Sequence, residues 1–399
     1  MCIGFGPNSK YRKRLGLYLH IPFCKSKCAY CDFFSFVPTN DELVRRYINA
    51  LVAHMEDYKS GAKLYSPDTI FIGGGTPTSL PTEQLLNLIK SIYKNFDVHK
   101  KAEFTIEANP ATVHYEMLRS IRKAGVNRIS FGLQSGDNKE LLGLTRHHNR
   151  AEFEQSYRDA RRAKFENINI DLMYGIPLQT KESFLRTLRY AVSLRPEHIS
   201  MYGLKIEEGT PFAVKEKEGS LYLPEEDTQY EMYITAVEFL ENNGYPQYEI
   251  SNFSRPGYEC RHNLKYWNCE EYLGIGASAH SYFNGSRFSF KRNIDQYMNG
   301  LEIKNSRIKL TDEDYAISQR ERVGEWIMLR MRLNDGVDTV EFENKYGLSF
   351  DEVCGNDLQK YIKQGFVTHK QNTYAFTPKG MFVSNYILSD VLTFHQGEI

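Results

Sequence analysis

The strongest constraint on the fold is a regular alternation of β-rich runs and helical stretches between residue 17 and about residue 243. The segments between the β-rich runs show helical apolar spacing, and several begin with a capping Asp, Thr or Ser. Six β–α units in sequence imply parallel strands joined by right-handed crossovers, so the sequence predicts an α/β barrel or an open sheet. The predicted strands lie at 17–21, 69–74, 103–109, 128–134, 167–177 and 198–206.

The residues at the strand ends favour a barrel. Each predicted strand ends in polar or glycine-rich residues, including a cysteine loop after the first strand and a Gly-Gly-Gly-Thr turn at 73–76. Barrel enzymes gather their site at the C-terminal ends of the strands. Eight units close a full barrel, whereas six leave a gap that can admit a wide ligand. We therefore expect an α/β fold with a partial (β/α)6 barrel over residues 1–243.

Two further regions are expected after the alternation stops. Residues 244–300 are rich in Tyr, Asn, Gly and Ser and show no further β–α unit. A long helical stretch is predicted at 311–333, followed by shorter helices, a hairpin at 365–377 and a final helix. Residues 301–399 are thus expected to form a small α+β domain that resembles a winged helix. Their 12 Lys and Arg against 15 Asp and Glu give a net charge of −3, which argues against a DNA-binding face.

Charge and cysteine content exclude several classes of protein. The 50 basic and 50 acidic side chains cancel, so there is no electrostatic reason to expect nucleic acid as a partner. No apolar run approaches the roughly 20 residues of a membrane helix, and the N-terminus does not resemble a secretory signal. Three of the seven cysteines lie within eight positions, which indicates metal binding rather than a disulfide framework. We expect a cytoplasmic protein with no membrane span.

The clustered cysteines are Cys24, Cys28 and Cys31, in the loop after the first predicted strand. One irregular loop can bring three such thiolates together on a [4Fe–4S] cluster, and the fourth iron then has no protein ligand. The main alternative is zinc, which requires four closed ligands. No second Cys-x2–4-Cys pair exists, and His20, the candidate fourth ligand, lies in the preceding strand. The spacing therefore favours the cluster.

The cysteine loop and its surroundings resemble the radical S-adenosylmethionine (SAM) superfamily, which places this spacing at the end of the first strand of a partial barrel. The resemblance implies a [4Fe–4S] cluster and SAM as cofactors, with SAM chelating the open iron. It also implies that Gly74, Gly75 and Thr76 form the glycine motif at the amino end of SAM, since glycines permit close approach of the backbone. The further SAM contacts that it implies are Tyr18, Tyr30, Glu107, Gln134, Arg146 and Asp171.

The segments YLHIPFC, GGGTPT, FGLQS and DLMYGIP narrow the resemblance to the HemN/HemW family. This family contains oxygen-independent coproporphyrinogen III oxidases and haem chaperones. In the oxidases a fourth cysteine follows two residues after the third, whereas this chain has Phe33 there. The oxidases also carry a longer N-terminal extension, whereas only 23 residues precede Cys24. Both differences favour the chaperone branch.

A second motif, HNLKYW at 262–267, matches a segment that is associated with haem in the chaperones. A neutral imidazole is a common axial ligand of haem iron, and Tyr and Trp offer flat apolar surfaces. Nearby Cys260 and Cys269 are alternative thiolate ligands. In a purely structural alternative the histidine caps a loop and the aromatic residues pack against the barrel. The haem contacts implied by the resemblance are His262, Asn263, Tyr266 and Trp267.

A basic stretch between Arg146 and Lys164 is a further candidate, because Arg pairs well with the propionates of a porphyrin. Most of it is expected to be a solvated helix face, so only Arg146 is kept as a site residue.

The resemblance implies three functions. The first is a haem chaperone that binds haem and, with the cluster and SAM, delivers it to an acceptor haemoprotein, for example a membrane respiratory enzyme. The second is a radical enzyme of porphyrin biosynthesis that oxidatively decarboxylates coproporphyrinogen III. The third is another radical SAM reaction on a tetrapyrrole.

Overall fold

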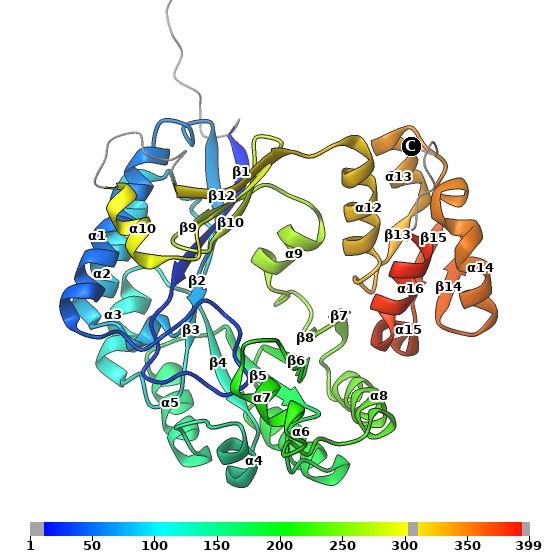
Figure 1. Cartoon of the computed structure of the whole chain (residues 1–399), viewed down its shortest axis with the longest axis horizontal. Helices are drawn as coiled ribbons and strands as arrows, with labels where there is room; N and C mark the ends of the chain where they lie inside the picture. Colours follow the sequence, from blue (N-terminus) through cyan, green and yellow to red (C-terminus); the bar gives the residue numbers. More distant parts are fainter. Residues whose placement is uncertain (1–11, 302–309, 393–399) are drawn as a thin grey trace, which may run out of the picture. The chain divides into compact units, whose positions relative to one another are not determined.

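The computed structural model describes residues 12–301 and 310–392, which fall into two compact units (Figure 1). The first unit contains Met1–Asp171, Lys205–Tyr222 and Glu270–Ala316, and the second unit contains Leu172–Leu204, Leu223–Cys269 and Ile317–Ile399. The units interleave along the chain, and each is described by itself. The domain boundaries at 243/244 and 300/301 stay a prediction. Residues 1–11, whose sequence does not resemble a secretory signal, lie outside the described residues.

The six predicted strands are present. In the first unit, β1 pairs in parallel with β2, β2 with β3, and β3 with β4. The boundary between the units falls inside β5, and β6 belongs to the second unit. The bounds are Lys13–Ile21 for β1, Tyr65–Gly74 for β2, Glu103–Ala108 for β3, Arg128–Gln134 for β4, Ile168–Tyr174 for β5 and His198–Gly203 for β6.

Burial explains why β1 is a central strand. Its alternate residues Leu15, Leu17, Leu19 and Ile21 are fully buried, and burying each such side chain contributes about 1.5–3 kcal/mol. The opposite face is not fully closed, since Tyr18 keeps some accessible surface although its neighbours are buried. A strand buried on one face and partly open on the other is suited to line the interior of a barrel.

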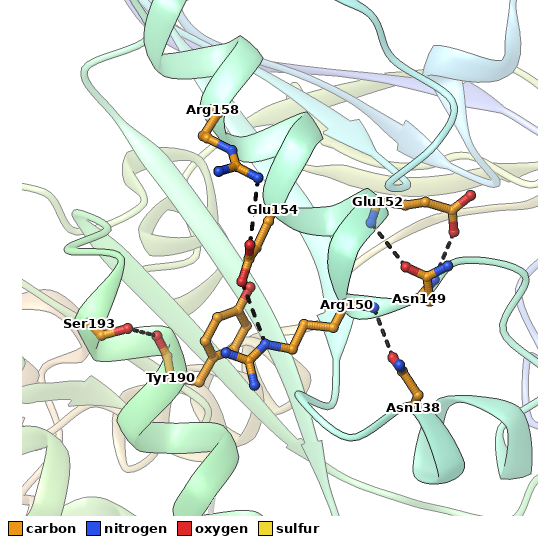
Figure 2. A network of polar contacts seen from close by, with 8 residues as sticks. All are labelled: Asn138, Asn149, Arg150, Glu152, Glu154, Arg158, Tyr190 and Ser193. Atoms are coloured by element: carbon orange, nitrogen blue, oxygen red, sulfur yellow. Dashed lines mark hydrogen bonds and ion pairs between the residues drawn. The ribbon is translucent and has the colours of Figure 1, made fainter.

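Helices α1, α2 and α3 of the first unit follow β1, β2 and β3 and lie along one side of these strands (Figure 1). The helix ends are well specified: the Asn40 side chain caps α1, and α5 begins with a capping box in which Asn149 and Glu152 exchange hydrogen bonds (Figure 2). The bounds are Asp41–Tyr58 for α1, Thr82–Asn95 for α2, Tyr115–Lys123 for α3, Asn138–Gly143 for α4, Arg150–Arg162 for α5, Pro211–Lys217 for α7 and Ile294–Leu301 for α10, with a short 3-10 turn at Pro77–Ser79.

The sheet continues beyond β1 into strands that the sequence did not predict. Strand β9 (Tyr272–Ile275) pairs in parallel with β1, and β10 (His280–Phe283), β11 (Ser286–Phe290) and β12 (Thr311–Ala316) follow as antiparallel neighbours. The complete strand order is β12-β11-β10-β9-β1-β2-β3-β4-β5-β6-β8-β7. Among the described strands this order does not close on itself, so the barrel is partial and not closed, as predicted.

The prediction of one long helix over 311–333 is wrong for its first six residues. These form β12, which pairs antiparallel with β11, for example Asp314 with Phe288. The helix α12 (Gln319–Arg330) begins only after Ser318, whose side chain accepts a hydrogen bond from the backbone of Glu321. The polar run at 311–316 is compatible with a helix, but β11 offers unpaired backbone groups, and pairing with them overrides local preference.

The second unit contains the remaining elements. Strands β8 (Asn252–Ser254) and β7 (Gln247–Glu249) pair antiparallel beside β6. A separate three-stranded sheet, in the order β13-β15-β14, contains the predicted hairpin as β14 (Val367–Lys370) and β15 (Thr373–Phe376). The other bounds are Lys181–Ser193 for α6, Glu226–Asn242 for α8, Arg261–Trp267 for α9, Val337–Asp338 for β13, Thr339–Tyr346 for α13, Asp351–Gly355 for a π-helical turn, Asn356–Lys363 for α14, Pro378–Phe382 for α15 and Ser384–Val391 for α16. The C-terminal part is therefore α+β, as predicted.

Candidate functional site

The cysteine loop is closed at its base by backbone hydrogen bonds. The Cys24 amide donates to the Phe36 carbonyl at 3.0 Å, and the Phe36 amide donates to the Pro22 carbonyl at 2.8 Å. This clamp forms because the chain leaves β1 and returns beside its own end, which fixes residues 24–35 as one loop. The three cysteines of the loop are therefore held together at the C-terminal end of β1. All three are free thiols, with Cys24 buried and Cys28 and Cys31 half-buried.

The thiols of the loop lie close enough to affect each other's ionisation. Burial raises the pKa of Cys24 and of Cys31, and the neighbouring Cys28 contributes in the same direction to both. Hydroxyl donors act in the opposite direction: Thr76 Oγ1 donates to Cys24 Sγ at 3.6 Å, and Ser35 Oγ lies 3.9 Å from Cys31 Sγ. Metal binding requires thiolates, and these hydroxyls are placed to stabilise them.

A hydrogen-bonded chain joins two of the three thiols through Arg146, Asn109 and Thr76. Arg146 Nη1 donates to Cys28 Sγ at 3.4 Å, and Nη2 donates to Asn109 Oδ1 at 2.5 Å. Asn109 Nδ2 donates to Thr76 Oγ1 at 2.7 Å, and Thr76 in turn donates to Cys24 Sγ. Because a guanidinium can only donate, the direction of every bond in the chain is fixed. The two thiols are thus positioned by one continuous network.

Arg146 is itself held in place by the segment after α4. Its Nη2 also donates to the Gly132 carbonyl at 2.9 Å, and its amide donates to the Leu141 carbonyl at 2.9 Å. The preceding Thr145 has a positive φ of 57° and accepts a hydrogen bond from the amide of Ala29 at 2.9 Å. This contact ties the segment directly to the cysteine loop, so the same turn that aims Arg146 also supports the cysteines.

The glycine turn packs directly on the cysteine loop. The Gly75 amide donates to the Ile21 carbonyl at 2.8 Å, and a Cβ at Gly75 would lie 2.7 Å from the Phe23 carbonyl oxygen and 3.0 Å from Cys24 Sγ. At Gly74 the backbone has φ +111°, and a Cβ would lie 2.5 Å from the His20 ring. Neither position has room for a side chain, so the turn requires glycine for close approach.

A polar cluster lies beside this turn. The Gly74 amide donates to Glu107 Oε2 at 3.1 Å, and burial followed by the nearby Asp171 raises the pKa of Glu107 to about 8. Asp171 accepts hydrogen bonds from Ser130 at 2.9 Å and from Asn169 at 2.8 Å. Two neighbouring carboxyl groups of this kind offer acceptors for a cationic or hydroxyl-bearing ligand.

His20 is engaged through both ring nitrogens. Its Nε2 lies 2.8 Å from the Phe34 carbonyl, so this nitrogen carries the proton, and its Nδ1 accepts from the Tyr18 hydroxyl at 3.0 Å. Burial lowers the pKa of His20 to about 4, so the ring is neutral near pH 7. The histidine considered as a fourth zinc ligand therefore serves to position Tyr18 and the loop.

Gln134 and Tyr30 complete the set of predicted SAM contacts. Gln134, at the end of β4, has a positive φ of 66°. Its side-chain amide lies next to Gly132, as do the side chains of Asn109 and Arg146. Tyr30 is half-buried, and burial raises the pKa of its hydroxyl, which also interacts with Cys28. The structure therefore brings all of the predicted cluster and SAM residues together in the first unit: Tyr18, Cys24, Cys28, Tyr30, Cys31, Gly74, Gly75, Thr76, Glu107, Gln134, Arg146 and Asp171.

The donor set suits a cluster better than a single ion. In the ranges 12–301 and 310–392 no three His, Cys, Asp or Glu side chains are grouped to hold one metal ion. A [4Fe–4S] cluster is wider, because each cysteine thiolate binds a different iron. Three neighbouring thiols without a fourth protein ligand, and a glycine turn against Cys24, fit such a cluster with one open iron.

Sequence reasoning did not select Asn109 or Thr145. Asn109 follows β3 directly, so its place at a strand end was a usable signal. For Thr145 no sequence pattern indicated the positive φ or the contact with Ala29.

The HNLKYW motif lies in the second unit, on α9. His262 is buried, and its Nε2 lies 2.8 Å from the hydroxyl of Tyr266, one helical turn later. Asn263 and Trp267 are half-buried. His262 lies inside the helix, so the structural alternative of a loop cap does not describe it. To bind haem iron through Nε2, His262 would have to release Tyr266.

Most of the basic stretch is a solvated face of α5. Glu154 lies between Arg150 and Arg158 and pairs with both at 3.6 Å (Figure 2). Both arginines are exposed, which agrees with the prediction.

Comparisons with known proteins identify the family of the chain. A model of the radical SAM superfamily matches residues 18–191, and one of the HemN C-terminal domain matches residues 317–383. The chain is 36% identical over 378 residues to the heme chaperone HemW of Bacillus subtilis (strain 168), covering 94% of this chain and 98% of that one. It is 34% identical over 380 residues to the heme chaperone HemW of Escherichia coli (strain K12), which covers 94% of this chain and 97% of that one.

A solved structure has the same fold. Coproporphyrinogen III oxidase (HemN) from Escherichia coli, a radical SAM enzyme, matches with a TM-score of 0.84 and 24% identity, over 96% of this chain and 91% of that chain. This likeness shows the fold. The chain therefore belongs to the HemN/HemW family of the radical SAM superfamily.

Proposed function

We propose that this protein is a haem chaperone, which binds haem and delivers it to an acceptor haemoprotein with the help of a [4Fe–4S] cluster and SAM. The observation that carries the proposal is the similarity over 94% of the chain to relatives that are named heme chaperones. Phe33, which stands where the oxidases of the family have a fourth cysteine, supports the same choice. Its side chain is 64% exposed, so it fills no structural position in the loop.

The residues of the first unit are proposed to hold the two cofactors. Cys24, Cys28 and Cys31 bind the cluster, and the glycine turn, Glu107, Gln134, Asp171, Tyr18 and Tyr30 surround SAM. When bound, the cluster and SAM supply one-electron chemistry. Arg146 offers a guanidinium for a carboxylate, and its hydrogen bonds to Asn109 after β3 and to the Gly132 carbonyl of β4 hold it in place.

Helix α9 is proposed to contact haem through His262, Asn263, Tyr266 and Trp267. The imidazole of His262 is the candidate iron ligand. Cys260, the alternative thiolate ligand, is buried, and its backbone amide donates to the Tyr248 hydroxyl at 3.2 Å. No helix of the described residues is long and apolar enough to cross a membrane. We propose that the protein works in the cytoplasm and hands haem to an acceptor, for example a membrane respiratory enzyme.

A turnover experiment separates this proposal from the oxidase and from other tetrapyrrole reactions. The cluster-reconstituted chain is incubated without oxygen with SAM, a reductant and either haem or coproporphyrinogen III, and product masses are recorded. The chaperone proposal predicts unmodified haem that passes to an added apo-haemoprotein, and no decarboxylated porphyrinogen. Decarboxylation that disappears in the Cys28→Ala variant would establish the oxidase instead, and haem of altered mass would establish a different reaction.

A further inference from the structure

A pocket on the first unit gathers positive charge that the proposed function does not use. It has a volume of about 380 Å³ and lies between the ends of α3 and α5. This volume falls within the roughly 300–1,000 Å³ that is usual for small-molecule sites. Its lining includes Tyr115 and five cationic side chains, Arg119, Arg122, Lys123, Arg162 and Lys164, and contains no acidic residue.

Contacts within the pocket hold several of these groups in place. Arg122 Nε donates to the Lys164 carbonyl at 3.1 Å, which joins the end of α3 to the turn after α5. The guanidinium of Arg162 lies over the Tyr115 ring at 4.0 Å from its centroid. Lys164 has a positive φ of 70°, and its amide donates to the Arg161 carbonyl at 3.0 Å. The fold thus places the guanidinium groups of Arg122 and Arg162 and the backbone of Lys164 before any ligand arrives.

The positive charge is largely unopposed by acidic side chains. Arg119 has a distant partner in Glu116 at 4.0 Å, and in the described part of the chain neither Lys123 nor Lys164 forms an ion pair. The exposed face of the same helix α5 behaves differently, since Glu154 there forms ion pairs with both Arg150 and Arg158 (Figure 2). The five cations of the pocket therefore have no acidic lining residue beside them, whereas two arginines of the neighbouring face share Glu154.

Helix dipoles explain only part of this arrangement. Arg122 and Lys123 lie in the last turn of α3, and Arg162 lies in the last turn of α5, where basic residues are favourable. Each helix end carries about half a negative charge, so two ends offset about one of the five cations. Lys164 lies beyond the helix, and Arg119 lies in an earlier turn, so neither is placed by the dipole.

We propose that this pocket binds a ligand that carries two or more phosphate groups. A lone carboxylate would satisfy only one of the cations, whereas a diphosphate brings several negative charges and many acceptor oxygens. Arg pairs with phosphate through two N–H groups, and Lys meets phosphate as a point charge. The same chemistry is offered by a soluble oligophosphate or nucleotide and by the two phosphodiester groups in the headgroup of cardiolipin, an anionic lipid. The site is separate from the cysteine loop and does not depend on the proposed function.

The test is calorimetric titration of the full-length chain with inorganic pyrophosphate at low ionic strength. The variant Lys123→Gln/Lys164→Gln removes two exposed pocket charges. The matched control Arg150→Gln/Arg158→Gln removes two exposed charges that pair with Glu154 on the face of α5, so both variants change the net charge equally. Melting temperatures of the variants check that both are folded. Vesicles of phosphatidylcholine with and without cardiolipin, which carries two phosphates, test the lipid source.

Saturable binding that weakens about tenfold or more in the pocket variant, or about 1.4 kcal/mol, and less than about twofold in the control supports the proposal. Binding of cardiolipin vesicles that pyrophosphate displaces would identify a lipid source, and pyrophosphate binding without vesicle binding would identify a soluble one. No saturable binding of pyrophosphate by the parent chain, or equal weakening in both variants, would overturn the proposal.

Discussion

Arg146 donates a hydrogen bond to the thiol of Cys28 across 3.4 Å, so a permanent positive charge lies beside a proposed iron ligand. The same guanidinium continues through Asn109 and Thr76 to Cys24. A fixed charge at this position would act on a cluster held by these two cysteines through both thiolates. Hydrogen bonds to the cysteine sulfurs and nearby charge are known determinants of the potential of an iron–sulfur cluster.

Replacing Arg146 should lower the reduction potential of the cluster. A cation stabilises the reduced, more negative state, so Arg146→Gln should shift the midpoint downward by on the order of 60 mV, equivalent to about 1.4 kcal/mol for a one-electron couple. The shift is measured by a redox titration followed by electron paramagnetic resonance, with iron content recorded for each sample. Arg150→Gln, which removes an exposed and ion-paired cation, is the control. An unchanged potential in Arg146→Gln at full iron loading would show that the guanidinium does not act on the cluster.

Asn109 is a positioning residue rather than a ligand. Asn109→Ala leaves the donors of Arg146 and the hydroxyl of Thr76 without their shared partner, at a cost of about 1–3 kcal/mol. We expect this variant to lose its cluster in air several times faster than the parent chain does. The loss is measured as the decay of the visible absorbance of the cluster. Asn138→Ala, a surface change that removes one hydrogen bond to Arg150, should leave the decay rate unchanged. Equal decay rates in Asn109→Ala and the parent chain would show that Asn109 does not position the cluster ligands.

Gly75 should tolerate no side chain. In Gly75→Ala the new Cβ meets the Phe23 carbonyl at 2.7 Å and Cys24 Sγ at 3.0 Å, so either the glycine turn or the cysteine loop must move. Overpacking of this kind typically destabilises the folded state by about 1–3 kcal/mol. We therefore expect the iron content per protein after reconstitution to fall to less than about half of the parent value. Gly61→Ala is the matched control, because its Cβ would meet only the Tyr58 carbonyl, at 3.8 Å. Full iron loading of Gly75→Ala would contradict the packing described.

Glu249 should make the stability of the second unit depend on pH. Burial raises the pKa of Glu249 from 4.5 to about 7, although Ser251 and Asn252 donate hydrogen bonds to it. The folded state therefore binds more protons than the unfolded state between these values. This contribution to stability is complete below about pH 4.5 and is lost as the pH rises through about 7.

A glutamine at this position isolates that effect. Glu249→Gln keeps an acceptor for Asn252 but has no charge to bury, so its melting temperature relative to the parent chain should rise between pH 5 and pH 8. Glu238→Gln, an exposed change on α8, should show a constant difference. A constant difference for Glu249→Gln as well would mean that Glu249 does not titrate in this range.

The sequence predicted most of the barrel because its strands are short apolar runs, and the cysteine loop because its spacing is unusual. It failed at 311–316, where a polar run pairs with β11 and forms β12. It also could not show that Arg146 and Asn109 meet, because these residues follow different strands and their contact depends on the barrel as a whole. The sequence showed which kinds of side chain stand at the strand ends of the candidate site. It did not show which hydrogen bonds these side chains form.

The central claim is that this protein carries haem, and the most direct measurement is an anaerobic haem titration of the cluster-reconstituted chain, followed in the Soret band. The account predicts saturable one-to-one binding that His262→Ala weakens at least about tenfold. Tyr266→Phe, which frees the His262 Nε2 from its 2.8 Å partner, should bind haem as tightly or more tightly. His114→Ala, an exposed histidine before α3, should bind as the parent chain does. Absence of saturable binding, or equal affinity in His262→Ala and the parent chain, would contradict the account.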